Sequence, residues 1–350
     1  MLTFVLHIYV HTLPPASSAI HIPTPLSVPL LHVSADLVLP PILTYSDNVL
    51  YNWDLNPPQS PSSSTIDPAH LRTQTTFSGT PSEEVFYLSS ARIELVGVSA
   101  LSLLRSTLDE AFVGDLLSLR RISQYLAELA NVVDAMTAVL TDLRQGCDPE
   151  VFFTEIRPWF RGQGGRRWIF EGAEAAGLAQ PKELSGPSAG QSSIIHALDI
   201  FLGIDRYSHA HVAGGVLSPA AQAQETPFLA RMQAYMPRHH RAFLSHLKAS
   251  PCAVRDLVAA APQERGIRAG LTAAYNAAVM AVKRFRDAHI RIAALYIVSQ
   301  ARRVRGGAEA ETEAETGAEL PPQNEGTGGT DLVPFLRGIR DKTAAAVLGD

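Results

Sequence analysis

The chain has 350 residues, of which 46% are hydrophobic and 18% charged, so it can form one large domain, or a large and a small one. Its formal net charge of −5 offers no basic surface to a nucleic acid, and we expect neither a nucleic-acid partner nor a membrane-spanning helix. Its two cysteines, Cys147 and Cys252, form no disulfide framework and predict a reduced, cytoplasmic protein.

The first 82 residues carry few helix signals. Residues 1–55 are rich in Pro, Val and Leu, and residues 56–82 have the Pro, Ser and Thr content of an exposed connector. The apolar start at residues 1–10 is short, and no Lys or Arg precedes it. A secretory signal carries a positively charged segment before its apolar run. We therefore expect no secretory signal.

Helical patterns begin at Glu83. Residues 83–105 and 109–144 space their apolar side chains by three and four, which predicts two long helices. Asp148, Pro149 and Glu150 combine an N-cap, a first-position proline and a first-turn acid, and Pro237 opens or kinks another segment. Alternating β-branched runs are rare after residue 83. The sequence therefore predicts a mostly α fold.

One apolar helical stripe contains a histidine, His289. Steps of four and three residues place the stripe on one buried face. Its members are Leu271, Tyr275, Ala278, Val282, Phe285, His289, Ile292 and Tyr296. A buried imidazole needs a partner for its ring nitrogens. His289 is therefore either a core histidine bonded to a carbonyl or an axial ligand of a buried metal or haem.

A run of small residues at 185–193 precedes an almost wholly apolar segment, 194–204, which predicts a buried helix. The run is either an ordinary loop and cap or a place where the backbone approaches a ligand. Asp199 lies within the apolar segment and needs a cation or donors. Arg286, one turn before His289, is a candidate partner for haem propionates, or for Asp199 in a structural pair.

Other candidates are weaker. Arg157 follows Phe153 by four residues, which suits either a flat ligand with a carboxylate or a solvated arginine over a core aromatic. The pairs His209 with His211 and His239 with His240 lack helical i, i+4 partners, so we interpret them as surface or loop histidines. The Gly-, Ala- and Glu-rich segment 306–329 predicts a mobile surface loop.

Seven motifs, in this order, resemble those of the indoleamine 2,3-dioxygenase family. The resemblance covers residues from about 30 to the C-terminus, and its runs from Ser188 to Ser193 and from Gly326 to Asp331 are the most specific. The motifs occupy residues 39–47, 86–90, 152–157, 185–193, 235–241, 286–289 and 326–331. Fewer residues precede the Tyr45 motif than in the family, so the resemblance implies a large helical haem-binding domain at 78–350 and part of a smaller domain at 1–77.

The resemblance also implies roles for individual residues. His289 would ligate the iron of haem b, with Arg286 and Asp199 on the propionate side. Arg157 would bind the substrate carboxylate. Phe86 would lie against the indole, and Ser188 and Ala189 would lie beside haem and substrate. The full set implied to line the substrate side is Tyr45, Phe86, Ser90, Phe152, Phe153, Ser188 and Ala189. Of these, Phe86 and Ser90 would share the catalytic site with Arg157.

The family reaction inserts both atoms of O2 across the indole C2–C3 bond of L-tryptophan to give N-formylkynurenine. The resemblance thus implies a cytoplasmic, monomeric haem enzyme whose partners are tryptophan, or a related indoleamine, and O2. One alternative is a haem or O2-binding protein of the same fold without this activity, which would not need Phe86 and Arg157. Another is a haem-free helical scaffold, which His289 argues against.

The resemblance implies that the run from Gly326 to Thr330 closes over the substrate, with the Thr327 hydroxyl oxygen accepting from the substrate ammonium. Thr327→Ala should reduce turnover of tryptophan and leave haem binding intact. Limited proteolysis checks the loop itself, because saturating tryptophan should slow cleavage near 326–330. Equal cleavage with and without tryptophan, together with full activity of the variant, would show that the segment is a linker.

Overall fold

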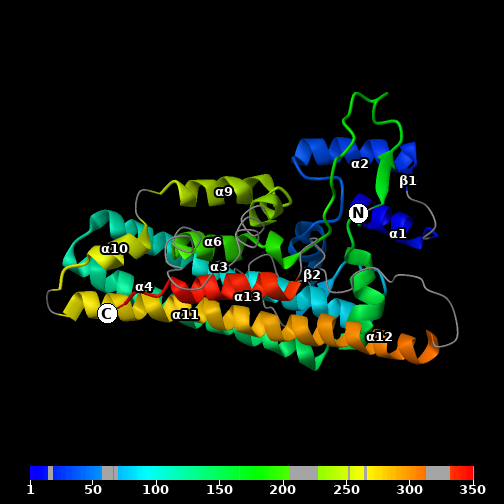
Figure 1. The fold of residues 1–350 in the computed structure, drawn as a ribbon. Helices are drawn as coiled ribbons and strands as arrows, with labels where there is room; N and C mark the ends of the chain where they lie inside the picture. The colour runs from blue at the N-terminus through cyan, green and yellow to red at the C-terminus, as the bar shows by residue number, and fades with distance from the viewer. Residues whose placement is uncertain are drawn as a thin grey trace.

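Helices dominate the computed structural model, which describes residues 1–14, 19–56, 66, 70–164, 166–204, 228–250, 253–263, 266–312 and 332–349 (Figure 1). The long helices run side by side, and the N-terminal elements gather near one end of them (Figure 1). The described strands are short and form two two-stranded sheets. The mostly α fold predicted from the sequence is confirmed.

Three long helices form the centre of the core: α3 (Pro81–Val113), α4 (Leu116–Asp142) and α11 (Ile267–Ala293). Helix α4 packs against both of the others. The sequence predicted a break between 105 and 109, but α3 continues to Val113. It ends there because Gly114 adopts a left-handed conformation (φ 72°), and Asp115 then caps α4 by accepting from the backbone of Ser118.

The apolar stripe of α11 is confirmed. Leu271, Tyr275 and Ala278 are fully buried, and Val282 and Ile292 nearly so. A π-helical turn, η8 (Ala294–Val298), then leads into α12 (Ser299–Thr312). Because α12 reaches Thr312, the prediction of a loop from residue 306 is wrong for its first seven residues. Residues 313–331, with Thr327, lie outside the described part of the chain.

A second layer covers one side of these helices. The predicted buried helix is confirmed as α6 (Ser193–Phe201), and α6 packs against α9 (Arg238–Lys248), which begins after Pro237 as expected. The pair His239 and His240 lies in the first turn of α9 and not in a loop, and His239 is exposed, in agreement with its interpretation as a surface histidine. Helices α10 (Val254–Ala260) and α13 (Leu332–Ala345) pack along α11.

The N-terminal segment is more helical than its composition predicted. It forms α1 (Leu2–Thr12) and α2 (Thr24–Leu37), with β1 (Ala19–Ile22) between them. Strand β1 pairs in parallel with β4 (Arg167–Phe170), and β2 (Trp53–Leu55) pairs antiparallel with β3 (Leu71–Thr73). The apolar residues of α1, β1 and β4 share one core cluster, which overrides the weak local signals. The domain division at residue 77 stays a prediction.

Short helical turns carry much of the chain between the long helices. They include the π-helical turns η1 (Ser46–Leu50) and η4 (Phe152–Ile156). The single-turn α5 (Pro149–Val151) begins at the predicted cap, where Asp148 accepts from the backbone of Glu150 and Val151. In the described part of the chain they also include the 3₁₀ segments η3 (Leu143–Gln145), η5 (Arg157–Phe160) and η6 (Ala189–Gln191).

Helix α3 is long and apolar enough to cross a membrane by length and composition, with a mean hydropathy of 1.3 over its most apolar 18 residues. The sequence analysis expected no membrane-spanning helix, whereas α3 is a candidate by length and composition. The helix packs against α4, and 44% of that window is buried within the protein. Its apolar content is thus explained by its place in the core.

Thr80 is the N-cap of α3. The Thr80 hydroxyl accepts from the backbone N–H of Glu83 at 3.3 Å, and the buried Glu83 carboxylate accepts from the N–H groups of Phe77 and Ser78. Thr80→Ala removes this cap and should lower the free energy of unfolding by about 1 kcal/mol. Ser99→Ala, at an exposed site within the same helix, is the control and should not destabilise. Equal denaturant midpoints for Thr80→Ala and the parent would contradict the role of the cap.

Candidate functional site

Two adjoining cavities lie among α3, α4, α6, α11 and α13. The first cavity encloses ≈ 220 Å³ and extends toward Asp199 and Arg286, and the second encloses ≈ 190 Å³ and extends toward Phe152 and Arg157. Both are lined mainly by apolar side chains. The residues common to both walls are Tyr45, Phe86, Ser90, Leu143, Ala189, Gly190, His289, Ile292, Phe335 and Leu336. The two cavities therefore form one hollow with His289 on its shared wall.

The side chain of His289 lines the hollow and forms no hydrogen bond with any described residue. Among the described residues, no donor or acceptor contacts either of its ring nitrogens, so the alternative of a core histidine bonded to a carbonyl is not supported there. Burial, and secondarily the charge of Arg286, lowers the pKa of His289 below its usual value. The ring is therefore neutral near pH 7, which is the protonation state that binds a metal ion.

Arg286 and Asp199 form a buried ion pair on the wall of the first cavity. Nη2 of Arg286 donates to both carboxylate oxygens of Asp199 at 2.7 and 2.6 Å, and Nη1 donates to the hydroxyl of Thr343. The ion pair between Arg286 and Asp199, one of the two alternatives left open by the sequence, is thus present. It ties α11 to α6 and α13, and it also leaves both charged groups at the edge of the hollow. Their role toward propionates stays a prediction.

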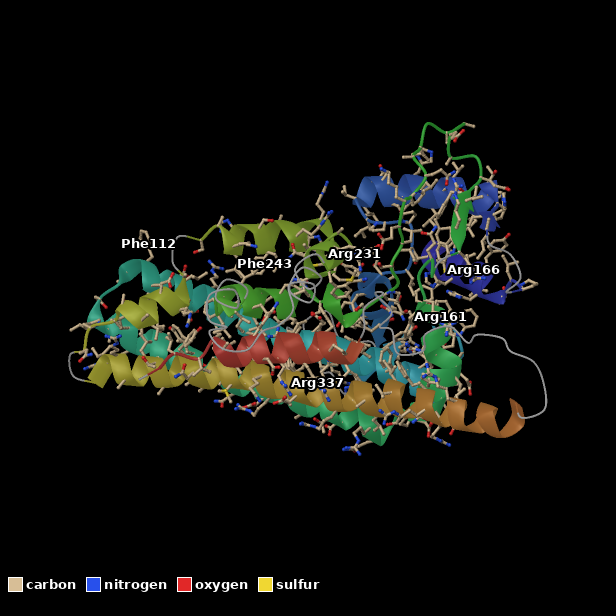
Figure 2. The ribbon with its side chains drawn as sticks, viewed as in Figure 1. Phe112, Arg161, Arg166, Arg231, Phe243 and Arg337 are labelled. Atoms are coloured by element: carbon tan, nitrogen blue, oxygen red, sulfur yellow. The ribbon has the colours of Figure 1, made fainter. Side chains whose placement is uncertain are left out.

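Arg157 is the cation of the second cavity. The residue is 7% exposed, and burial, followed by the charge of Arg161, lowers its pKa to about 10, so that it remains protonated at neutral pH. Arg161 and Arg166 lie farther out, beside α1 (Figure 2). Phe153 stacks on the guanidinium, with its ring centre 5.4 Å from the Arg157 carbon Cζ. Phe153 therefore packs against Arg157, and it is not among the residues that line the two cavities. Its implied place beside the substrate stays a prediction.

An aromatic group surrounds the inner end of the second cavity. The ring of Phe86 lies 4.8 Å from that of Phe152 and 5.7 Å from that of Phe160. Phe86, Phe152 and Phe160 all line the second cavity, beside Arg157. The sequence did not single out Phe160. Such a wall suits a flat, apolar ring next to a carboxylate.

The loop at 185–193 closes another side of the hollow. Ser188 and Ala189 line the hollow, where the resemblance placed them. The Ser188 hydroxyl caps η6 by accepting from the backbone N–H of Gly190 at 3.2 Å. Gln191 was missed from the sequence, but its amide fixes the loop: Oε1 accepts from the backbone N–H of Tyr45 at 2.8 Å, and Nε2 donates to Gly186 O at 2.9 Å. The loop and the Tyr45 motif are therefore one unit.

Helix α13 supplies a wall that the sequence analysis also missed. Phe335 and Leu336 line both cavities, and Ile339 lines the first. Ile339 follows Phe335 by four residues and Leu336 by three. This helical spacing of apolar residues was the sequence signal that could have predicted the wall. The remaining predicted site residue, Thr327, lies outside the described residues.

Comparison with known proteins assigns the chain. A sequence model described as indoleamine 2,3-dioxygenase matches residues 1–346. The chain belongs to this family. Its members are haem-dependent dioxygenases of tryptophan catabolism that use an indoleamine and O2, so the protein is an indoleamine 2,3-dioxygenase family enzyme.

Relatives with known names cover most of the chain. Indoleamine 2,3-dioxygenase 2 of Mus musculus is 32% identical over 93% of this chain and 73% of its own length. Indoleamine 2,3-dioxygenase of Saccharomyces cerevisiae is 32% identical over 93% of this chain and 72% of its own. The 6-hydroxytryptophan 2,3-dioxygenase fscD of Fusarium equiseti is 29% identical over 91% of this chain and 74% of its own. The family therefore fixes the reaction class and leaves the indole substrate open.

Gly186 allows the backbone of the loop to contact another segment. A methyl group there would overlap the carbonyl oxygen of Phe160 and press on the backbone of Gly162. Gly186→Ala should therefore lower the free energy of unfolding by about 1–3 kcal/mol and displace the loop. Gly270→Ala, where a methyl group meets nothing within 4 Å on an exposed face of α11, is the control. Unchanged thermal stability of Gly186→Ala would contradict the tight contact.

Proposed function

We propose that this enzyme opens the indole ring of L-tryptophan with O2 to give N-formylkynurenine, using haem b bound through His289. The observation that carries the proposal is the neutral imidazole without a hydrogen-bond partner among the described residues, on the wall of an apolar hollow that Arg157 also lines. Family membership supports the same reaction class.

The residues present fit a haem. His289 offers a nitrogen donor to the iron, and the apolar walls of both cavities suit the faces of a porphyrin. Arg286, held by Asp199 and Thr343, places a cation where a propionate would need one. When bound, the haem iron supplies the activation of O2, which protein side chains do not provide.

The protein itself binds and orients the substrate. In our proposal, the guanidinium of Arg157 pairs with the tryptophan carboxylate, while Phe86, Phe152 and Phe160 hold the indole ring. Ser90 lies on the shared wall and would face the indole, and Thr327 would take the ammonium. Phe153, stacked beneath Arg157, fixes the direction of the guanidinium.

Acid–base catalysis by the protein is not needed in this scheme. Among the described residues that line the second cavity, none is an aspartate or glutamate, and the one imidazole belongs to His289. The wall instead excludes water and positions the reactants, and this is what a reaction driven by a cofactor requires of its protein. We further propose that the enzyme acts as a cytoplasmic monomer.

His289→Ala tests the haem site. The variant should lose stoichiometric haem uptake, or the absorption spectrum of five-coordinate histidine-ligated haem, because the iron loses its protein ligand. His246→Ala, which removes an exposed histidine from α9, is the control and should bind haem as the parent does. A His289→Ala protein with unchanged haem content and spectrum would refute the assignment.

Arg157→Leu tests the substrate pose. Loss of a charge-assisted bond in a closed site should reduce kcat/KM for tryptophan by about 2–4 kcal/mol, or about 30- to 1,000-fold, while haem content is retained. Arg161→Leu, which removes an exposed neighbouring charge, should keep most of the activity. Steady-state kinetics with tryptophan and 6-hydroxytryptophan measure both variants. If kcat/KM of Arg157→Leu equals that of the parent for both substrates, the carboxylate binds elsewhere.

A further inference from the structure

A separate cleft opens on the other side of α3. It encloses ≈ 410 Å³ between η1, β2, α3, α6 and α9, and it shares only Val49 with the described walls of the two cavities. Tyr51, Val98 and Phe243 are 62%, 53% and 41% exposed, so the cleft is open to solvent. Phe243 lies on α9, well away from Arg161 and Arg166 (Figure 2).

Glu94 of α3 supplies the carboxylate of this cleft. Its Oε1 accepts from the hydroxyl of Tyr45 at 3.0 Å and from that of Ser192 at 2.6 Å. None of the ion pairs among the described residues includes Glu94. Burial raises the pKa of Glu94 above its usual value. The carboxylate is therefore held by hydroxyl donors but lacks a positive partner in the described part of the chain, although it lines a cleft large enough to admit one.

The rest of the cleft is mainly aromatic and aliphatic. Tyr51, Trp53 and Phe243 line it, together with aliphatic side chains of α3. The rings of His239 and His240 meet edge to face at 4.5 Å, and His240 Nδ1 hydrogen-bonds the Ser193 hydroxyl at 2.6 Å. Burial, and then the neighbouring His239, lowers the pKa of His240, so this ring adds no positive charge at neutral pH. An aromatic wall beside a carboxylate is a surface that attracts organic cations.

We infer that this cleft binds a small organic cation with an aromatic or aliphatic body, its ammonium group on Glu94 and its body among Tyr51, Trp53 and Phe243. A metal ion is a poorer fit, because the described residues contain no cluster of three or more histidine, cysteine or carboxylate side chains. An anion is disfavoured by the carboxylate. The site is independent of the haem assignment.

The probe pair for this site is 2-phenylethylamine, a cation at neutral pH, and 2-phenylethanol, which has the same body without the charge. Calorimetric titration of the full-length protein with each compound measures binding. The amine should bind with one-to-one stoichiometry, and the alcohol should bind at least about tenfold more weakly, because it lacks the charge-assisted contact. Equal binding of both compounds, or no binding of the amine, would overturn the inference.

Variants locate the bound amine. Glu94→Gln keeps the size and an acceptor oxygen but removes the charge, and should weaken binding of the amine at least about tenfold. Phe243→Ala changes only an exposed wall residue, so it should fold normally, and it should weaken binding about threefold or more. Phe152→Ala removes an aromatic ring from the second cavity instead and should leave amine binding unchanged. Loss of binding in Phe152→Ala, with parental binding in Phe243→Ala, would place the amine in the second cavity and overturn the inference.

Discussion

The structure depends on a hollow that its own side chains leave unfilled. Protein interiors normally pack without large voids, yet side chains of α3, α4, α6, α11 and α13 surround two joined cavities of ≈ 220 and ≈ 190 Å³. His289 borders that space, and none of the described residues forms a hydrogen bond with its ring. In our proposal, a haem fills this space and takes His289 as its protein ligand. The Arg286–Asp199 pair then provides charge at its edge.

The parts of the site that a helical repeat determines were predictable from the sequence. The stripe of α11 places His289 on a buried face because residues three and four apart share one side of a helix. Arg286, one turn earlier, and Asp199 on the buried α6 were marked because charged groups on apolar helices need partners. Their pairing with each other was one of two alternatives left open, because periodicity assigns a face but does not select the partner across it.

The parts that depend on irregular backbone or on distant contacts were not predictable in the same way. The π-helical turn η4 closes with a bond from Arg157 N to Phe152 O, and both of these residues line the second cavity, whereas Phe153 packs beside the guanidinium. In the sequence, Glu94 is not distinguishable from an ordinary helix glutamate. Its special environment comes from hydrogen bonds donated by Tyr45 and Ser192, which are 49 and 98 residues away. The N-terminal helices likewise form against β4 despite weak local signals, because packing overrides propensity.

A crystal structure of the protein with haem and tryptophan bound is the most direct test of the central claim. The account predicts iron at bonding distance from a ring nitrogen of His289, with the porphyrin filling the joined cavities and the tryptophan carboxylate paired with Arg157. The indole should lie against Phe86 within the second cavity. Iron ligated by another residue, or tryptophan bound away from Arg157, would contradict the account.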